Sequence, residues 1–250
     1  MKKLVLIAVL MLIACATKQT HEFADGPESN LRERARIHTE LGAGYFAQGQ
    51  MGIALEEFTN ATKIDPSYGM AQNGLGLVFS ALHEDVKAEA SFKKSLELDP
   101  GNSESLNNYG TFLCTRNRID ESITQFLEAV KNPLYGTPGV AYINAGVCSL
   151  KKKDTANAEI YLQKALQQQP LLHQASYQLA LIEYDRGHLE AARNYLRLPL
   201  ASEGVSADIL WLGIKVERKL GGKDAESSYA LQLRQQYPNS EQTKALLSGR

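Results

Sequence analysis

The sequence lacks features that are typical of nucleic-acid-binding proteins, metalloproteins and enzymes. No block of like charges occurs, because 27 lysines and arginines are interspersed with 28 aspartates and glutamates. The five histidines are scattered, with no pair at the spacing of zinc ligands, and no catalytic nucleophile motif is present. These absences predict a protein that is not an enzyme and that has no metal, no cofactor, no small-molecule substrate and no nucleic-acid partner.

A hydrophobic run long enough to span a membrane is missing from the N-terminal region. The apolar run there extends from Leu4 to Ala14, which is shorter than the roughly 20 residues that a spanning helix needs. Two lysines precede the run, which predicts a secretory signal peptide over residues 1–14. Its end, LIAC, resembles the bacterial lipobox, and this resemblance implies that Cys15 is lipidated before cleavage. The alternative is a plain secretory signal in which Cys15 is incidental.

The lipoprotein resemblance also implies a location. Ala16 follows the cysteine, and the usual signal for retention in the inner membrane is an aspartate at that place. We therefore expect the acyl chains on Cys15 to anchor the protein at the periplasmic face of the outer membrane. Residues 15–34 are expected to form a flexible tether that leads into the first helix, because the stretch ATKQTHEFADGP shows no apolar periodicity.

A repeat with a period of 34 residues begins after the tether. The segments 41–66 and 75–100 align, so that the pair Leu41-Gly42 of the first returns as Leu75-Gly76 of the second. This pattern resembles the tetratricopeptide repeat, a hairpin of two antiparallel helices in which small residues allow close helix approach. Pro66 and Pro100 end their units, since proline disfavours helix in the residue before it.

Six such units can be aligned, with fidelity that decreases along the chain. They predict an all-α fold, a right-handed superhelix of about six tetratricopeptide repeats over residues 35–238. Two additional residues lie in the stretch NPLYGTP, between the third and fourth units. Residues 239–250 are expected to extend the last helix as a polar C-terminal cap.

Two cysteines remain if Cys15 carries lipid. Cys114 and Cys148 fall late in the first helices of the third and fourth units, which pack side by side. An even pair in an oxidising compartment predicts a disulfide. The alternative is that both are small apolar residues buried without a bond.

The concave surface of the superhelix is the predicted partner-binding groove, lined mainly by the first helix of each unit. Asparagines there can donate to and accept from a peptide backbone, and apolar residues further along can hold its side chains. Replacing Tyr177 and Tyr184 by serine is expected to abolish partner capture with little effect on stability. The alternative is that half of the groove residues pack between repeats. The predicted groove consists of Asn73, Asn107, Asn108, Asn144, Val140, Ile143, Val147, Tyr177, Leu181 and Tyr184.

The combination of a lipobox, a short tether and six repeats resembles the PilW/PilF family of type IV pilus lipoproteins. The forms NNYGTFLC and NAGVC support this, because they are not part of the general repeat consensus. The resemblance implies a pilotin or assembly factor whose partner is the outer-membrane secretin, a PilQ-like ring, or another protein of the pilus machinery. It also allows a role in pilus stability. The alternative is an outer-membrane scaffold that recruits enzymes of cell-wall synthesis or hydrolysis.

Overall fold

The computed structural model describes residues 27–249, and every regular element in that range is a helix. The predicted all-α fold is therefore confirmed. The signal peptide, Cys15 and the first part of the predicted tether lie outside the described residues. The thirteen helices of the described range are α1 (Pro27–Ala47), α2 (Met51–Ile64), α3 (Gly69–Ala81), α4 (Asp85–Leu98), α5 (Ser103–Thr115), α6 (Ile119–Ala129), α7 (Pro138–Lys151), α8 (Thr155–Gln168), α9 (His173–Asp185), α10 (Leu189–Leu200), α11 (Ala207–Leu220), α12 (Lys223–Gln236) and α13 (Glu241–Leu247).

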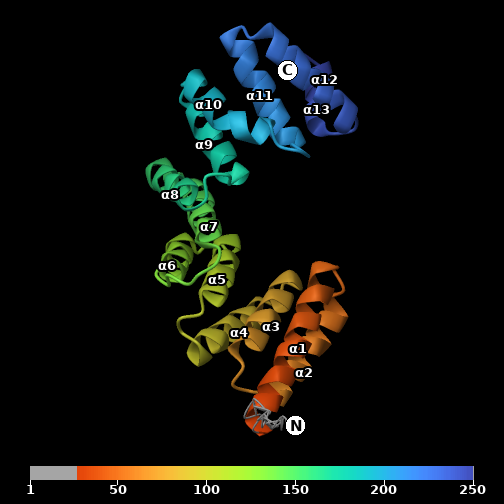
Figure 1. The fold of residues 1–250 in the computed structure, drawn as a ribbon, viewed down its shortest axis with the longest axis vertical. Helices are drawn as coiled ribbons and strands as arrows, with labels where there is room; N and C mark the ends of the chain where they lie inside the picture. The colour runs from red at the N-terminus through yellow and green to blue at the C-terminus, as the bar shows by residue number, and fades with distance from the viewer. Residues whose placement is uncertain (1–26, 250) are drawn as a thin grey trace, which may run out of the picture.

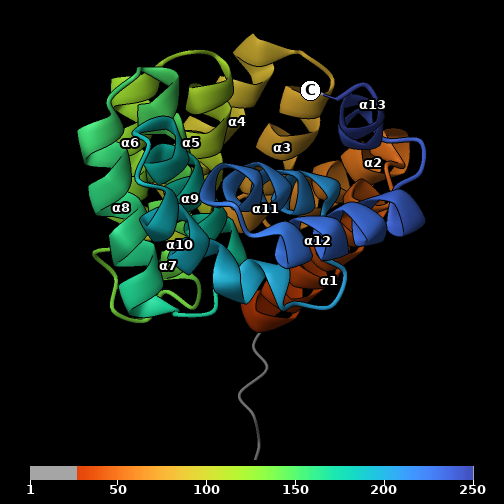
Figure 2. The same ribbon diagram turned by 90° about the horizontal axis from the view of Figure 1, so that it is seen from above.

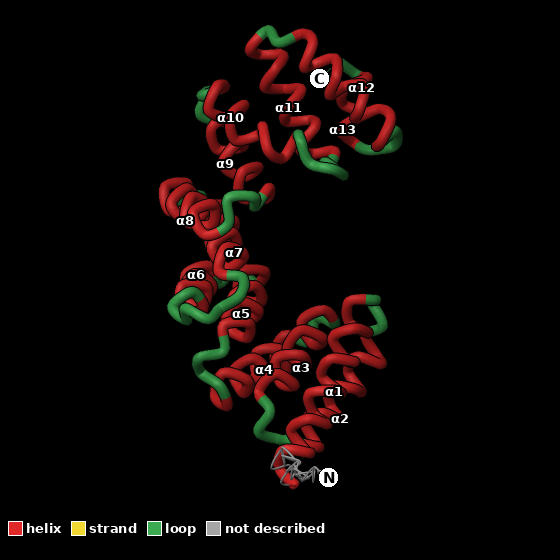
Figure 3. Tube along the Cα trace, viewed as in Figure 1, coloured by secondary structure: helices red, strands yellow, loops and turns green. Residues whose placement is uncertain are grey.

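The first twelve helices pack as six antiparallel hairpins, each formed by an odd-numbered helix and the even-numbered helix after it. Each hairpin also packs against the next one, so that the chain curves into a superhelix (Figure 1). Short loops join the helices throughout (Figure 3). This is the predicted array of six tetratricopeptide repeats.

Glycines of the odd-numbered helices allow close packing within each hairpin. A Cβ atom on Gly76 would lie 2.7 Å from the ring of Phe92, and one on Gly110 would lie 2.7 Å from the ring of Phe126. Both phenylalanines are fully buried at equivalent places in α4 and α6. The glycine and the aromatic ring thus fill one space together, which is the physical basis of the 34-residue pattern.

Within each repeat, the turn between the two helices contains one residue in the left-handed conformation. Glycine occupies this place after α1, α9 and α11, but His83, Asn117 and Lys153 occupy it after α3, α5 and α7. Ion pairs tie these turns to the preceding repeat. The guanidinium of Arg116 binds Asp85 at the start of α4, and Lys152 binds Asp120 at the start of α6 at 2.6 Å.

Five tight turns of one kind occur between or after the hairpins, each with proline at its second position. In each turn the amide of the fourth residue donates to the carbonyl oxygen of the first, at 3.1 or 3.2 Å. The five turns comprise residues 65–68, 99–102, 132–135, 169–172 and 237–240. We refer to them as the proline turns.

Both ends of the described chain differ from a simple continuation of the repeats. α1 starts at Pro27, inside the segment 15–34 that was expected to lead into the first helix. The expectation that residues 239–250 extend the last helix is wrong. The proline turn at 237–240 ends α12, Ser240 caps α13 by accepting from the amide of Thr243, and the buried Thr243 donates to the carbonyl oxygen of Tyr237.

No helix within residues 27–249 combines the length and the apolar character needed to cross a membrane.

Candidate partner-binding surfaces

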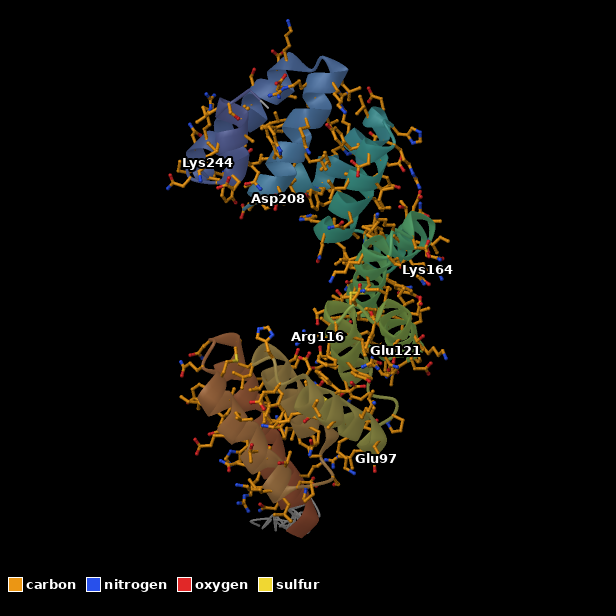
Figure 4. All side chains as sticks on the ribbon, turned by 180° about the vertical axis from the view of Figure 1, so that it is seen from behind. Glu97, Arg116, Glu121, Lys164, Asp208 and Lys244 are labelled. Carbon is orange, nitrogen blue, oxygen red and sulfur yellow. A yellow bond between two sulfur atoms is a disulfide. The ribbon has the colours of Figure 1, made fainter. Side chains whose placement is uncertain are left out.

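The odd-numbered helices line the concave side of the curve. Viewed from behind, Arg116 and Asp208 lie on this side, whereas Glu121 and Lys164 lie on the convex side (Figure 4). α5, α7 and α9 carry all residues of the predicted groove except Asn73, which belongs to α3. The structure places these residues in two different environments.

The asparagines of the predicted groove bind one another across the junctions between repeats. Asn108 Nδ2 donates to Asn73 Oδ1 at 3.3 Å, and Asn144 Nδ2 donates to Asn107 Oδ1 at 3.0 Å. Asn73 is only 2% exposed, so its assignment to an accessible groove is wrong. The other three are half-buried and retain unused amide donors and acceptors on the concave side.

The apolar residues of the predicted groove are only partly accessible. Ile143 is 3% exposed and packs with Leu162 and Leu179 in the core, so its assignment to the groove is wrong. Val147 and Leu181 are half-buried, and Val140 is exposed. The physical reason is that each first helix receives side chains from the next repeat as well as from its own hairpin.

Tyr177 and Tyr184 belong to the junction between the fifth and sixth repeats. Both pack against a core cluster that contains Leu196 and Leu212, and burial raises the pKa of Tyr177 above its usual value. The ammonium groups of Lys215 and Lys219 lie 5.0 and 4.2 Å from the centre of the Tyr184 ring. Since these contacts stabilise the junction, the expectation that replacing both tyrosines leaves stability nearly unchanged does not fit the structure.

A disulfide joins Cys114 of α5 to Cys148 of α7, with 6.0 Å between their Cα atoms. Ser122 lies beside it, with its Oγ 3.2 Å from Sγ of Cys148. A hollow of about 150 Å³ opens next to the bond, lined by Thr111, Cys114, Thr115, Phe126, Asn144, Val147 and Lys151. The disulfide therefore connects the third and fourth repeats directly beneath the concave surface.

A second apolar surface lies on α1, and the sequence analysis missed it. Ile37 and Leu41 are both exposed, and they line a shallow hollow of about 400 Å³ with Glu40, Gly44, Tyr45 and Gln48. In later repeats the equivalent face is covered. Ala71 packs against Ala61 of α2, and Ala141 packs against Ala129 of α6. Among the described residues no repeat precedes α1, so this face, here called the α1 stripe, has no such cover.

The alignment of repeats contained the signal for the α1 stripe. Leu41 occupies the same place as Leu75, which is a packing position, yet no aligned unit precedes the first repeat. An apolar residue at a packing position without a neighbour indicates an interface.

Many charged side chains of the described region form ion pairs between or within repeats. The buried Glu217 binds Arg193 at 2.6 Å, and the buried Glu183 binds Arg186 at 2.9 Å. Within residues 27–249 no three histidine, cysteine, aspartate or glutamate side chains group as metal ligands do. In each pair the carboxylate is the buried partner, and the more exposed arginine neutralises its charge, which is a structural role.

Comparisons with known proteins agree with this architecture. Tetratricopeptide repeat family models match residues 39–103, 91–124 and 140–170. The chain is 33% identical over 210 residues to the type IV pilus assembly protein PilF of Pseudomonas aeruginosa, and the match covers 84% of this chain and 83% of PilF.

Solved structures extend the similarity to three dimensions. The crystal structure of PilW, described as a widely conserved type IV pilus biogenesis factor, superposes with a TM-score of 0.74 at 34% identity, over 85% of this chain and 98% of PilW. The structure of Pseudomonas aeruginosa PilF superposes with a TM-score of 0.78 at 30% identity, over 88% of this chain and all of PilF. YrrB, a tetratricopeptide repeat protein with an unusual peptide-binding site, shares the fold at 17% identity and a TM-score of 0.56, over 76% of this chain and 97% of YrrB.

Proposed function

Because the chain belongs to the PilF/PilW family of type IV pilus biogenesis proteins, we propose that it binds the outer-membrane secretin, or another pilus protein, and promotes its assembly. Binding this partner is the only activity that we propose for the protein. The family relationship supports a role in pilus biogenesis, and the surfaces described above support recognition of a protein segment.

The α1 stripe is the observation that carries the proposal. In every later repeat the equivalent face receives side chains of a helix from the preceding repeat, as Ala71 receives Ala61. The stripe therefore has the shape and the apolar character that suit one more helix. An amphipathic helix of the partner would bury Ile37 and Leu41, which in the free chain are exposed to water.

The concave surface offers a second contact for the same partner. The half-buried Asn107, Asn108 and Asn144 can each form further hydrogen bonds with a peptide backbone, while Val140 and Val147 offer apolar contact. A partner segment that continues from the α1 stripe into the concave side would use both surfaces.

The proposal also includes lipidation of Cys15, which would determine the location of the protein in the cell. The acyl chains would hold it at the periplasmic face of the outer membrane, next to the secretin. The twelve residues from Cys15 to the start of α1 can span at most roughly 40 Å when fully extended. The repeats therefore remain within reach of a membrane-embedded partner.

The first test is a gel of outer-membrane fractions from cells with and without the gene, probed for detergent-resistant secretin multimers. Loss of multimers, restored by the normal gene and only weakly by a Cys15→Ser variant, is the expected result. Intact multimers with missing or unstable pili would indicate that the protein acts at a later step of pilus biogenesis. Intact multimers and normal pili would contradict the proposal and would favour a scaffold for cell-wall enzymes.

A further inference from the structure

The five proline turns differ at their third position, which is the tip of each turn. Three turns have a small or polar residue there, as is usual at such tips, and two have leucine. The tip residues in chain order are Ser67, Gly101, Leu134, Leu171 and Asn239. Leu134 is 89% exposed and Leu171 is 72% exposed.

The fold itself does not require leucine at these tips. In both turns the next residue does the packing, since Tyr135 and Leu172 lie against the core clusters of their repeats. The hydrogen bond that closes each turn joins backbone atoms only. The turn at 65–68 has the same hydrogen bond with Ser67 at its tip, so a serine is compatible with the same backbone.

Both leucine turns lie on the side of the molecule where the N-terminal segment joins the repeats. The first turn of α1 and the loops α6–α7 and α8–α9 are at the lower side of the view from above (Figure 2). α3 and α4 occupy the opposite side of that view. Val86 is 86% exposed at the start of α4, so it serves as an exposed apolar residue outside the two leucine turns.

We propose that the turns at 132–135 and 169–172 contact a lipid surface, with Leu134 and Leu171 inserted among the acyl chains. This rests on the lipid anchor at Cys15 that forms part of the proposed function. The lipid is favoured over a protein occupant because the chain that carries the anchor enters the repeats on the same side. The twelve residues from Cys15 to α1 keep the start of α1 within roughly 40 Å of the membrane.

The contact depends on the anchor. Two leucine side chains bury much less apolar area than one acyl chain, and a single acyl chain already gives only marginal membrane binding. The anchor makes the second contact intramolecular, so that a weak interaction is occupied most of the time. The contact would fix the orientation of the superhelix and present its concave side in one direction.

Tryptophan fluorescence tests the proposal in the full chain. The only tryptophan, Trp211, is replaced by phenylalanine, and tryptophan is then introduced by Leu134→Trp, Leu171→Trp or Val86→Trp in three separate proteins. Each is produced with its N-terminal segment, extracted from membranes in detergent and reconstituted into vesicles of phosphatidylethanolamine, phosphatidylglycerol and brominated phosphatidylcholine. Flotation of the vesicles reports the anchor, and quenching by bromine reports the contact.

The expected result is that all three proteins float and that bromine removes about half of the emission at positions 134 and 171, since interfacial side chains lie about 5–10 Å deep. Emission at position 86 should change little. Floating proteins without quenching at 134 and 171, or with equal quenching at 86, would overturn the contact and leave the anchor intact. Proteins that do not float would overturn the anchor and the contact together.

A double variant, Leu134→Ser with Leu171→Ser, separates a lipid from a protein occupant. It should keep the melting temperature of the parent protein, because Ser67 occupies the same position in the proline turn at residues 65–68. In the anchored state it should show faster proteolysis on this side of the repeats than the parent protein. Unchanged proteolysis together with loss of secretin multimers in cells would assign the leucines to a protein partner and overturn the lipid contact.

Discussion

Arg118 donates from Nη1 to Oε2 of Glu89 at 2.8 Å, and so connects the turn before α6 to the middle of α4. Glu89 also binds the ammonium group of Lys93 at 2.8 Å and accepts from the hydroxyl of Tyr109 at 3.1 Å. One carboxylate thus links the second repeat to the third through two partners, Arg118 and Tyr109. The pKa of Glu89 is lowered to about 2, first by the hydrogen bond from Lys93 and then by those from Arg118 and Tyr109.

Replacement of Glu89 by glutamine should destabilise the protein at neutral pH and have no effect in acid. The lowered pKa means that the ionised form stabilises the folded state fully above about pH 4.5, and that this contribution disappears as the pH falls through about 2. We expect Glu89→Gln to cost on the order of 1–2 kcal/mol at pH 7, after allowance for solvent screening. Urea unfolding of both proteins between neutral pH and pH 3 checks this, and a difference that does not narrow in acid would contradict it.

The disulfide between Cys114 and Cys148 should be complete in protein from an oxidising compartment. When the protein is unfolded without reductant, neither Cys114 nor Cys148 should therefore react with a thiol-labelling reagent. Reaction of both cysteines would contradict the bond. The bond closes a loop with a sequence separation of 34 residues. Its removal by Cys114→Ser with Cys148→Ser should cost about 2–4 kcal/mol of unfolding free energy.

Two glycines in helices should respond in opposite ways to alanine. A Cβ on Gly74 would lie 2.2 Å from the ring of the buried Phe58, whereas a Cβ on Gly52 would meet nothing within 4 Å. We expect Gly74→Ala to destabilise by about 1–3 kcal/mol through overpacking. Gly52→Ala should stabilise by up to about 1 kcal/mol through helix propensity. Thermal unfolding of the pair measures both effects, and equal shifts would refute the packing argument.

Replacement of Tyr177 and Tyr184 by serine should lower stability as well as any binding. Both rings are half-buried at the last repeat junction, so we expect a loss of about 2–4 kcal/mol for the double variant. Tyr184→Phe keeps the ring beneath Lys215 and Lys219 and should cost less than about 1 kcal/mol. Urea midpoints distinguish the two. An unchanged urea midpoint for the double variant would indicate that these tyrosines are accessible groove residues and do not stabilise the junction.

A charge on the α1 stripe should block partner binding without unfolding the protein. Leu41 and Ile160 are both 47% exposed in helices, on α1 and α8 respectively, and so form a matched pair. Leu41→Asp should reduce secretin multimers or piliation about tenfold or more, because burial of an unpaired carboxylate is costly. Ile160→Asp should leave both unchanged. Both variants should keep their stability within about 0.5 kcal/mol, and equal effects in cells would rule out the α1 stripe as the binding surface.

The sequence predicted the architecture because the repeat positions are set by local packing. The spacing of Gly76 and Phe92, and of Gly110 and Phe126, follows directly from one ring that fits against one glycine. The C-terminal helix was harder to predict. The pattern indicated a polar tail, but whether Thr243 binds the end of α12 depends on the direction in which the turn at 237–240 sends the chain.

The binding surfaces could be predicted only in part, because accessibility depends on neighbouring repeats. Asn73 and Ile143 have residue types suited to a groove, but side chains of the adjoining repeat cover them. The position of a residue within its own repeat does not tell whether it is buried, as Asn73 and Ile143 are, or exposed, as Val140 is. The α1 stripe shows the opposite case, since Ile37 is exposed for lack of the covering helix that each later repeat has.

The place of the disulfide has a mechanical consequence. It joins the third repeat to the fourth, at the midpoint of an array in which opening begins at the ends and spreads from each repeat to its neighbour. A covalent link at the centre stops a local opening in one half from spreading to the other. A pull on one end of the protein would therefore loosen three repeats and leave the remaining three folded.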